Sequence, residues 1–368
     1  MIVAVAKEIK VHEYRVGLTP ANAKVYAKKG HIVLVEKDAG LYSGYTNEDY
    51  EKAGAQIYED KKAMFDKADM IIKVKEPQPS EYDLFHEGQI LYTYLHLAAD
   101  KPQAEALMKK KVKAVAYETM EEKGKLPCLN PMSEIAGRLS IQEGARFLER
   151  PQGGKGVLLG GIPGVNRGKV VVIGGGVVGI NAAKMAVGMG AEVTILDINP
   201  ERLAYLDDIF GGQVTTLYST EENISLSIRQ ADLVVGAVLI PGAKAPHLIK
   251  KSDLKEMKPG SVIVDVAVDQ GGCFETTKAT NHDDPVFTID GVVHYCVANM
   301  PGAVAITSTQ ALTGVTLKYG LMIADLGVEE AVRQNDTINK GLNVYMGHMT
   351  CPQVAADLDL PYTAFKNI

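Results

Sequence analysis

Hydrophobic residues in the first third of the chain gather in short runs separated by longer mixed segments. The runs are rich in valine, isoleucine and leucine and occupy Ile2–Ala6, Ile32–Glu36, Met70–Val74, Ile90–Leu95 and Ala114–Tyr117. Between the first two runs, Thr19 and Pro20 suit the start of an amphipathic helix, and Gly30 suits its end. Largely apolar strands that alternate with helices predict a parallel sheet covered on both faces.

The alternation starts again in the middle of the chain. We expect a helix over Ser133–Arg150 and a loop over Pro151–Gly168, which is rich in glycine and proline. The next strands are expected at Lys169–Ile173, Glu192–Leu196, Leu233–Val238 and Val262–Val268. Ser308–Leu326 then predicts one long helix, with no strong signal for a parallel strand after it.

The chain is too long for one ordinary domain. It has 368 residues, whereas domains usually have roughly 100–200. The pattern therefore predicts an α/β protein with two doubly wound, parallel-sheet domains of the Rossmann type. Because the C-terminal helices of such proteins often cross back, we expect a discontinuous first domain, residues 1–128 and 306–368, around a second domain, residues 129–305.

Charge and hydropathy exclude several classes of protein. The formal net charge is −6, which argues against nucleic acid as the main partner, because phosphate binding needs a basic surface. The longest apolar stretch, Val170–Ile180, contains glycines and is too short for a membrane span of about 20 residues. The N-terminus has no basic region before its short apolar run, so no signal peptide is predicted. We expect a cytoplasmic protein.

The cysteines give no sign of a metal site. The four cysteines are far apart and form no C-x-x-C pair. We therefore expect neither a bound metal nor a disulfide framework, and we interpret the cysteines as thiols in a reducing compartment.

A glycine motif follows the strand at Lys169–Ile173. Gly174, Gly176 and Gly179 form G-x-G-x-x-G between that strand and a helix. In a dinucleotide-binding turn, the first glycine allows the tight turn, the second lets the pyrophosphate approach, and the third lets helix and strand pack closely. The N–H groups at the helix N-terminus favour phosphate, so the motif predicts a dinucleotide site that also includes Val177.

The next strand ends in an acidic residue, Asp197, 18 residues after Gly179. This is where a carboxylate accepts hydrogen bonds from the adenosine ribose and repels a 2′-phosphate, so we expect NAD rather than NADP. Arg202 lies nearby and can soften this preference, but we expect its side chain to be solvated.

Other strand ends matter because ligands bind outside the carboxyl ends of parallel strands. Asp269 follows the expected strand Val262–Val268 and precedes two glycines, which favours a place at the cofactor crevice or, equally, an ordinary turn. The same argument adds Val238 and Leu239, which precede Pro241-Gly242, and Asn299 and Met300, which precede Pro301-Gly302. Val266 and Val297 are two further candidate cofactor residues.

Three basic residues in the first domain are candidates for chemistry. Arg15 lies in a loop, Lys75 follows the strand Met70–Val74, and His96 follows Ile90–Leu95. Arginine and lysine together bind a small carboxylate, and histidine transfers protons near neutral pH. Each alone is more often structural, but Lys75 and His96 are expected at the same edge of one sheet, which favours a functional role.

Several of these segments resemble the alanine dehydrogenase and pyridine nucleotide transhydrogenase family, over nearly the whole chain. The similar segments are Lys7-Glu8, Glu13–Pro20, Lys75-Glu76-Pro77, Tyr94-Leu95-His96, Asn130–Arg138 and Val268–Gly272. The resemblance implies conversion of L-alanine, with NAD and water, to pyruvate, ammonium and NADH. It also implies a homohexamer whose two Rossmann-type domains close around the substrate. We expect residues 1–128 and 306–368 to form the substrate domain and residues 129–305 to form the NAD-binding domain.

The resemblance assigns roles to individual residues. Arg15 and Lys75 bind the substrate, and His96 and Asp269 carry out the acid–base steps. Residues that match positions lining the NAD site are Ser133, Asp197, Arg202, Ser219, Leu239, Asn299 and Met300.

Two other functions fit part of the pattern. The soluble NAD(H)-binding subunit of a transhydrogenase shares the architecture but needs no amino acid site. A non-catalytic NAD-sensing protein needs Gly174, Gly176, Gly179 and Asp197. It has no reason to carry together a second set of residues: Arg15, Lys75, His96 and Asp269. The combination therefore favours the dehydrogenase.

Overall fold

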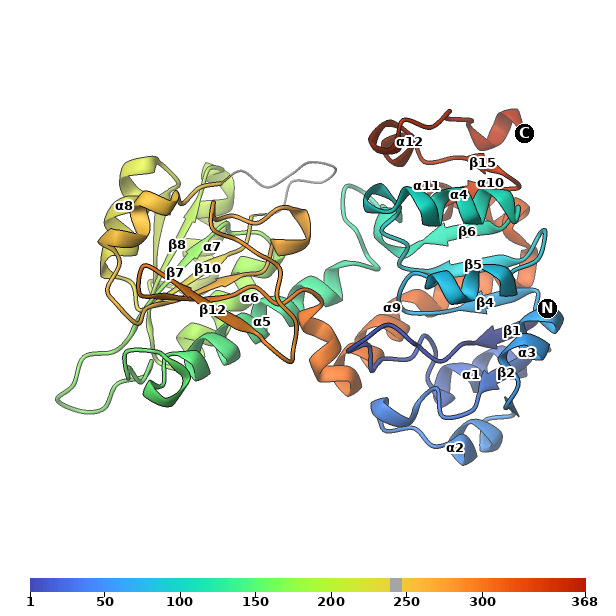
Figure 1. Ribbon diagram of the computed structural model, residues 1–368, viewed down its shortest axis with the longest axis horizontal. Coiled ribbons are helices and arrows are strands. Elements are labelled where there is room, and N and C mark those ends of the chain that lie inside the picture. The colour runs from blue at the N-terminus through green and yellow to red at the C-terminus, as the bar shows by residue number, and fades with distance from the viewer. Residues whose placement is uncertain (239–246) are drawn as a thin grey trace. The chain divides into compact units, whose positions relative to one another are not determined.

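The computed structural model describes residues 1–238 and 247–368. The chain forms two compact units, unit 1 with Met1–Met132 and Gly302–Ile368, and unit 2 with Ser133–Pro301 (Figure 1). Both are α/β folds of mostly parallel strands, as the hydrophobic pattern predicts. The assignment of substrate to one unit and cofactor to the other stays a prediction.

Unit 1 contains an eight-stranded sheet in the order β15-β14-β6-β5-β4-β1-β2-β3. Its strands are β1 (Ile2–Val5), β2 (Ile32–Glu36), β3 (Gln56–Tyr58), β4 (Met70–Ile72), β5 (Ile90–Thr93), β6 (Lys113–Ala116), β14 (Leu342–Tyr345) and β15 (His348–Met349). Its helices are α1 (Pro20–Lys28), α2 (Asn47–Lys52), α3 (Lys61–Lys67), α4 (Lys101–Lys109), α9 (Ala305–Leu326), α10 (Val328–Gln334), α11 (Asp336–Gly341) and α12 (Pro352–Leu358). The strands from β6 to β3 are parallel, while β14 and β15 add an antiparallel edge.

Unit 2 contains a seven-stranded sheet in the order β12-β13-β11-β10-β7-β8-β9, parallel except at β12. Its strands are β7 (Lys169–Ile173), β8 (Glu192–Asp197), β9 (Val214–Tyr218), β10 (Leu233–Gly236), β11 (Val262–Asp265), β12 (Val286–Ile289) and β13 (Val292–Tyr295). Its helices are α6 (Val177–Gly188), α7 (Pro200–Phe210), α8 (Glu221–Gln230) and most of α5 (Asn130–Phe147).

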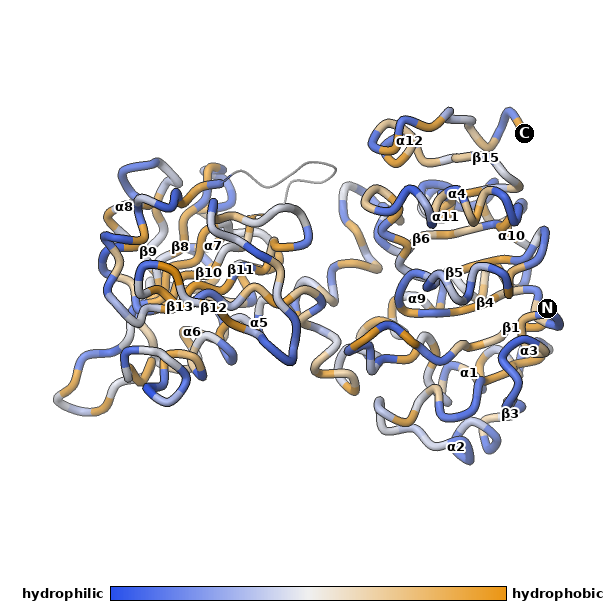
Figure 2. The backbone as a smooth tube through the Cα atoms, viewed as in Figure 1, coloured by the Kyte–Doolittle hydropathy of each residue, from blue (hydrophilic) through white to orange (hydrophobic). Residues whose placement is uncertain are grey.

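The central strands are buried along their whole length, because helices cover parallel sheets on both faces. Every residue of β4, β5, β10 and β11 is buried. Figure 2 shows these strands as predominantly hydrophobic and many of the surface loops as hydrophilic. The start of α1 is confirmed in detail, since the Thr19 side chain accepts a hydrogen bond from the Asn22 N–H.

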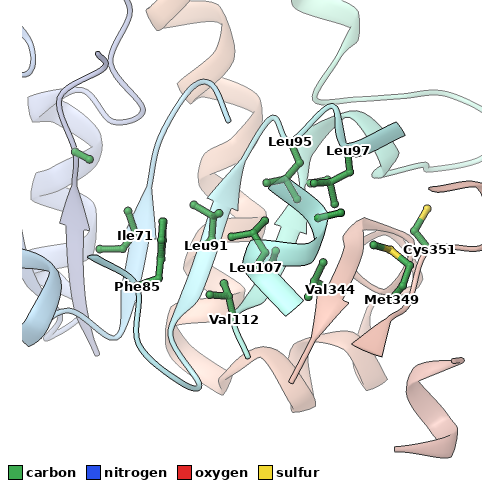
Figure 3. Packing of buried hydrophobic residues seen from close by; sticks show 14 of the residues in the cluster. Ile71, Phe85, Leu91, Leu95, Leu97, Leu107, Val112, Val344, Met349 and Cys351 are labelled. Carbon is green, nitrogen blue, oxygen red and sulfur yellow. The ribbon is translucent and has the colours of Figure 1, made fainter. Parts of the chain in front are cut away.

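The end of the chain completes the core of unit 1. In Figure 3, Val344 and Met349 pack in one hydrophobic cluster with Leu91 of β5 and Leu107 of α4. Strand β14 pairs with β6 and covers that edge of the sheet. More than 200 residues separate these two strands in sequence, so the end of the chain returns to the sheet that its beginning forms.

Some element boundaries differ from the sequence prediction. The strand expected over Val262–Val268 ends at Asp265, so Asp269 lies in a short 3₁₀ turn, η7 (Val268–Gln270), and not at a strand tip. The predicted helix Ser133–Arg150 begins earlier, at Asn130, and ends at Phe147. The sequence pattern did not predict the strands β3, β9, β12, β13, β14 and β15, each of two to five residues, because such short segments show little periodicity.

Candidate functional site

The carboxyl ends of β4 and β5 bring Lys75 and His96 to one edge of the sheet in unit 1. The two strands are parallel neighbours, with Ile72 opposite Tyr92, and β1 lies on the other side of β4. The loop after β1 carries Arg15, whose charge interacts with Tyr94 next to His96 in sequence. The structure therefore groups Arg15, Lys75 and His96 in unit 1.

A carboxylate holds the guanidinium of Arg15. Glu13 accepts hydrogen bonds from Nε of Arg15 at 2.6 Å and from Nη2 at 2.5 Å, and both side chains are buried. Burial alone lowers the pKa of Arg15, but the charge and hydrogen bonds of Glu13 outweigh it, and the pKa is raised. This bidentate pair fixes the plane of the guanidinium.

Buried charges also support Lys75. Oε1 of Glu8 accepts hydrogen bonds from the N–H of Val74 at 2.6 Å and of Lys75 at 3.3 Å. The Nζ of Lys73, which is fully buried, lies 3.1 Å from Oε2 of Glu8. Burial raises the pKa of Glu8, although Lys73 opposes the shift. A charged pair behind the strand thus fixes the backbone from which the Lys75 side chain extends.

His96 has an unusual backbone conformation and two carboxylate neighbours. Its φ is +51°, in the left-handed region, and its N–H donates to Oε1 of Glu118 at 2.6 Å. Its Nδ1 lies 3.3 Å from Oε2 of Glu76, and its side chain is 41% exposed. Burial alone raises the pKa of Glu76, but His96 and the neighbouring lysines outweigh burial and hold this pKa far below its usual value. A charged Glu76 beside Nδ1 favours the tautomer of His96 with its proton on that nitrogen.

The glycine motif of unit 2 has the geometry of a phosphate-binding turn. Gly174 has a φ of +99°, which suits glycine. A Cβ on Gly179 would lie 1.8 Å from the carbonyl oxygen of Gly174, so helix α6 approaches the turn as closely as the backbone allows. A Cβ on Gly176 would meet no atom within 4 Å. The space that a pyrophosphate needs is therefore open at Gly176, and the residues fit a dinucleotide.

Asp197 and Arg202 both bind this turn. Oδ2 of Asp197, the last residue of β8, accepts a hydrogen bond from the N–H of Gly175 at 2.7 Å. Arg202 donates from Nε to the carbonyl of Gly175 and is half-buried. Arg202 is therefore partly solvated, as expected, and its guanidinium also binds the backbone of the turn.

The other predicted cofactor residues follow strand ends of unit 2 or lie on α5. Val238 and Val266 follow β10 and β11, Ser219 follows β9, and Val297, Asn299 and Met300 follow β13. Ser133 lies on α5, at the start of unit 2. Leu239 lies outside the described residues. Asp269 is exposed in the turn η7.

Sequence reasoning missed the carboxylates that hold these groups. Glu13 lies two residues before Arg15, and Glu76 directly follows Lys75, so both were close in sequence to candidate residues. Glu118 was harder to find, because it is 22 residues from His96. Asp265 was also missed, although an acidic residue within the apolar run Val262–Val268 is unusual; in the structure it ends β11.

Two kinds of feature are absent from the part of the chain that the structure describes. No group of three or more histidine, cysteine, aspartate or glutamate side chains there has the arrangement of a metal site. No helix among those residues is long and apolar enough to cross a membrane.

The chain resembles known proteins along nearly its whole length. Residues 4–136 match the family described as alanine dehydrogenase/PNT, N-terminal domain, and residues 140–352 match its C-terminal domain. The alanine dehydrogenase of Methanococcus maripaludis is 58% identical over 99% of this chain and 98% of the relative. The alanine dehydrogenase of Bacillus subtilis is 57% identical over 98% of this chain and 96% of the relative.

Solved structures agree with these matches. An L-alanine dehydrogenase structure has a TM-score of 0.95 and 52% identity, and the match covers 98% of this chain and 99% of that one. A transhydrogenase from Sinorhizobium meliloti has a TM-score of 0.82 and 25% identity, over 96% of this chain and 99% of that one.

Proposed function

This chain belongs to the alanine dehydrogenase/pyridine nucleotide transhydrogenase family, and from this premise we propose that it catalyses the NAD-dependent, reversible conversion of L-alanine to pyruvate and ammonium. It is an enzyme of the oxidoreductase class that acts on alanine, since relatives with that activity in their names share 54–58% of its residues. The finer parts of the proposal are the cofactor, the products and the residue roles.

One observation carries the residue roles. Arg15, Lys75 and His96 follow the neighbouring strands β1, β4 and β5 of one sheet. A carboxylate binds the Arg15 guanidinium, another accepts from the Lys75 backbone N–H, and a third lies beside the His96 ring. A transhydrogenase subunit or an NAD sensor has no need for such a set, because neither binds an amino acid. The set therefore favours a dehydrogenase over both alternatives.

Each of the three candidate residues of unit 1 has a role in this reaction. Arg15 binds the substrate carboxylate through charge-assisted hydrogen bonds. Lys75 stabilises the negative charge that develops on the carbonyl oxygen. Nε2 of His96, whose ring is oriented by Glu76, exchanges protons with the reacting groups.

The proton transfers are shared between His96 and Asp269. The substrate ammonium first loses a proton, and NAD, when bound at the glycine turn, would supply the acceptor for the hydride that leaves Cα. Water then adds to the iminium carbon, which requires a base, and ammonia leaves from the carbinolamine, which requires an acid. We assign these transfers to His96 and Asp269 together, without dividing them between the two.

Dependence on ammonium tests this function. We expect purified protein to oxidise NADH in the presence of pyruvate only when ammonium is also present, because the carbonyl must first form the iminium that accepts the hydride. The decrease in NADH absorbance measures the rate. Oxidation without ammonium would indicate a hydroxy-acid dehydrogenase, and no oxidation with both would contradict the proposal.

We propose NAD as the cofactor because a carboxylate, Asp197, ends β8 beside the glycine turn. Asp197→Asn keeps an oxygen that accepts a hydrogen bond but removes the charge that repels a 2′-phosphate. We expect the ratio of kcat/KM with NAD to kcat/KM with NADP to fall by about tenfold or more. Each tenfold change in this ratio corresponds to about 1.4 kcal/mol.

Asp208→Asn serves as the control for this change. Asp208 is exposed on α7, so the substitution removes the same charge from the same unit without touching the turn. The control should keep the wild-type ratio. An unchanged ratio in Asp197→Asn would mean that Asp197 does not select the cofactor.

We also propose a cytoplasmic homo-oligomer, a hexamer by family resemblance. The loop before β7 exposes Leu158, Ile162 and Val165, each more than 60% accessible, and clustered apolar side chains on a surface loop support contact with another copy. All four cysteines are free, which supports a reducing compartment.

A further inference from the structure

Asp265 is a buried carboxylate for which the reaction has no direct use. It is the last residue of β11, and its exposed fraction is 0%. Burial raises its pKa, while hydrogen bonds from Thr277, Cys273 and Ala267 oppose the shift. A carboxylate at such a position is costly unless it is fully hydrogen-bonded, so its partners indicate what it does.

The partners of Asp265 lie at both ends of one loop. Oδ1 accepts a hydrogen bond from the N–H of Ala267 at 3.0 Å. Oδ2 accepts one from the N–H of Cys273 at 2.9 Å and one from the hydroxyl of Thr277 at 2.5 Å. The two oxygens of one side chain therefore close the loop between residues 267 and 273, and Asp269 lies within that loop.

The loop is closed further by its own backbone. The N–H of Gly272 donates to the carbonyl of Ala267 at 3.1 Å. Gly272 has a φ of +82°, and a Cβ there would lie 2.5 Å from Thr277. The turn is therefore tightly packed against its base at Asp265 and Thr277, whereas Asp269 itself is exposed.

The neighbouring strand makes room for this carboxylate. Gly236 of β10 is the register partner of Asp265. A Cβ on Gly236 would lie 3.2 Å from Oδ1 of Asp265 and 2.6 Å from the Phe274 ring. A glycine at this position thus lets the carboxylate occupy the space between the strand and the loop.

We propose that Asp265 is a positioning residue for the dehydrogenase reaction: its carboxylate fixes the turn that carries Asp269 and so places the Asp269 carboxyl group for proton transfer. The inference rests on the acid–base role of Asp269 under the proposed function. Proton transfer needs heavy atoms about 2.6–3.2 Å apart, and a displacement of about 1 Å costs up to 100-fold in rate. A loop without its anchor cannot hold that geometry.

The test combines Asp265→Asn with Asp269→Asn. Asparagine at 265 keeps one accepting oxygen, but in either orientation its NH₂ group faces a backbone N–H, that of Ala267 or that of Cys273. We expect Asp265→Asn to lower kcat by about 10- to 100-fold, with the Kd for NADH, measured by its fluorescence, changed by less than about threefold. We further expect no additional loss of kcat when Asp265→Asn is added to Asp269→Asn, because both act through one group.

Asp232→Asn is the matched control. Asp232 is also a buried carboxylate in unit 2, and it accepts a hydrogen bond from the Lys169 N–H at 2.7 Å. It differs from Asp265 in position, because it lies just before a strand, β10, and not at the carboxyl end of one. The control should lower thermal stability and keep kcat within about threefold, as expected for a substitution away from the reacting groups.

The possible outcomes separate the positioning role of Asp265 from the acid–base role of Asp269. Wild-type kcat in Asp265→Asn, or losses that multiply in the double variant, would overturn the positioning role. Wild-type kcat in Asp269→Asn would instead refute the acid–base role of Asp269 and, with it, the basis of the inference. If Asp265→Asn does not fold, Thr277→Val removes only one hydrogen bond, and the same non-additive loss with Asp269→Asn is expected.

Discussion

Replacing His96 with asparagine is expected to lower kcat by about 10²- to 10⁴-fold, the usual contribution of a positioned acid–base group. NADH binding and folding should be unchanged. Asparagine is the appropriate substitute because the φ of His96 is +51°, and asparagine tolerates the left-handed region better than alanine. The measurements are steady-state turnover of alanine, NADH fluorescence titration and thermal unfolding.

His86→Asn provides the control. His86 is another exposed histidine of unit 1, and its Nδ1 lies 3.1 Å from the backbone carbonyl oxygen of Glu87. It should keep wild-type turnover. A folded His96→Asn enzyme with wild-type kcat would remove His96 from the mechanism.

Gly179→Ala is expected to abolish binding of the dinucleotide and to destabilise unit 2. The added Cβ would lie 1.8 Å from the carbonyl oxygen of Gly174, so α6 must move away from the turn. Overpacking of this kind costs about 1–3 kcal/mol or more, and the displaced helix no longer presents its N-terminal N–H groups to phosphate. Thermal unfolding and NADH titration measure the two effects.

Two other glycines separate these effects. A Cβ on either Gly176 or Gly188 meets no atom within 4 Å. Gly176→Ala should keep the stability of the protein but weaken NADH binding, because the methyl group occupies the path of the pyrophosphate. Gly188→Ala, at the end of α6, should bind NADH normally and gain up to about 1 kcal/mol of helix stability. Tight NADH binding by Gly179→Ala would show that the turn does not hold the cofactor.

Local patterns in the sequence were sufficient to predict the main architecture. The strand at Lys169–Ile173, the glycine turn and Asp197 follow one another within 30 residues, so each supports the others. Lys75 and His96 were predictable as neighbours because parallel strands end at the same edge, and β4 and β5 are adjacent.

The groups that orient the candidate residues were much less predictable. The hydrogen bond from Val74 to Glu8 joins residues 66 positions apart, and no local pattern encodes that contact.

The wrong prediction that Asp269 lies at a strand tip had a different cause. The run Val262–Val268 has the hydrophobicity of a strand. However, the Asp265 carboxylate accepts hydrogen bonds from the N–H groups of Ala267 and Cys273, and the backbone turns after residue 265. Hydrophobicity alone cannot detect such a side-chain anchor.

The most direct measurement is reduction of NAD by single amino acids, with L-alanine compared against glycine, L-serine, L-valine and D-alanine. We predict that NADH absorbance rises with L-alanine in the presence of purified protein, that pyruvate appears in equal amount, and that Asp232→Asn enzyme behaves like wild type. Protein that binds NADH but produces none of it from L-alanine would contradict the proposed function.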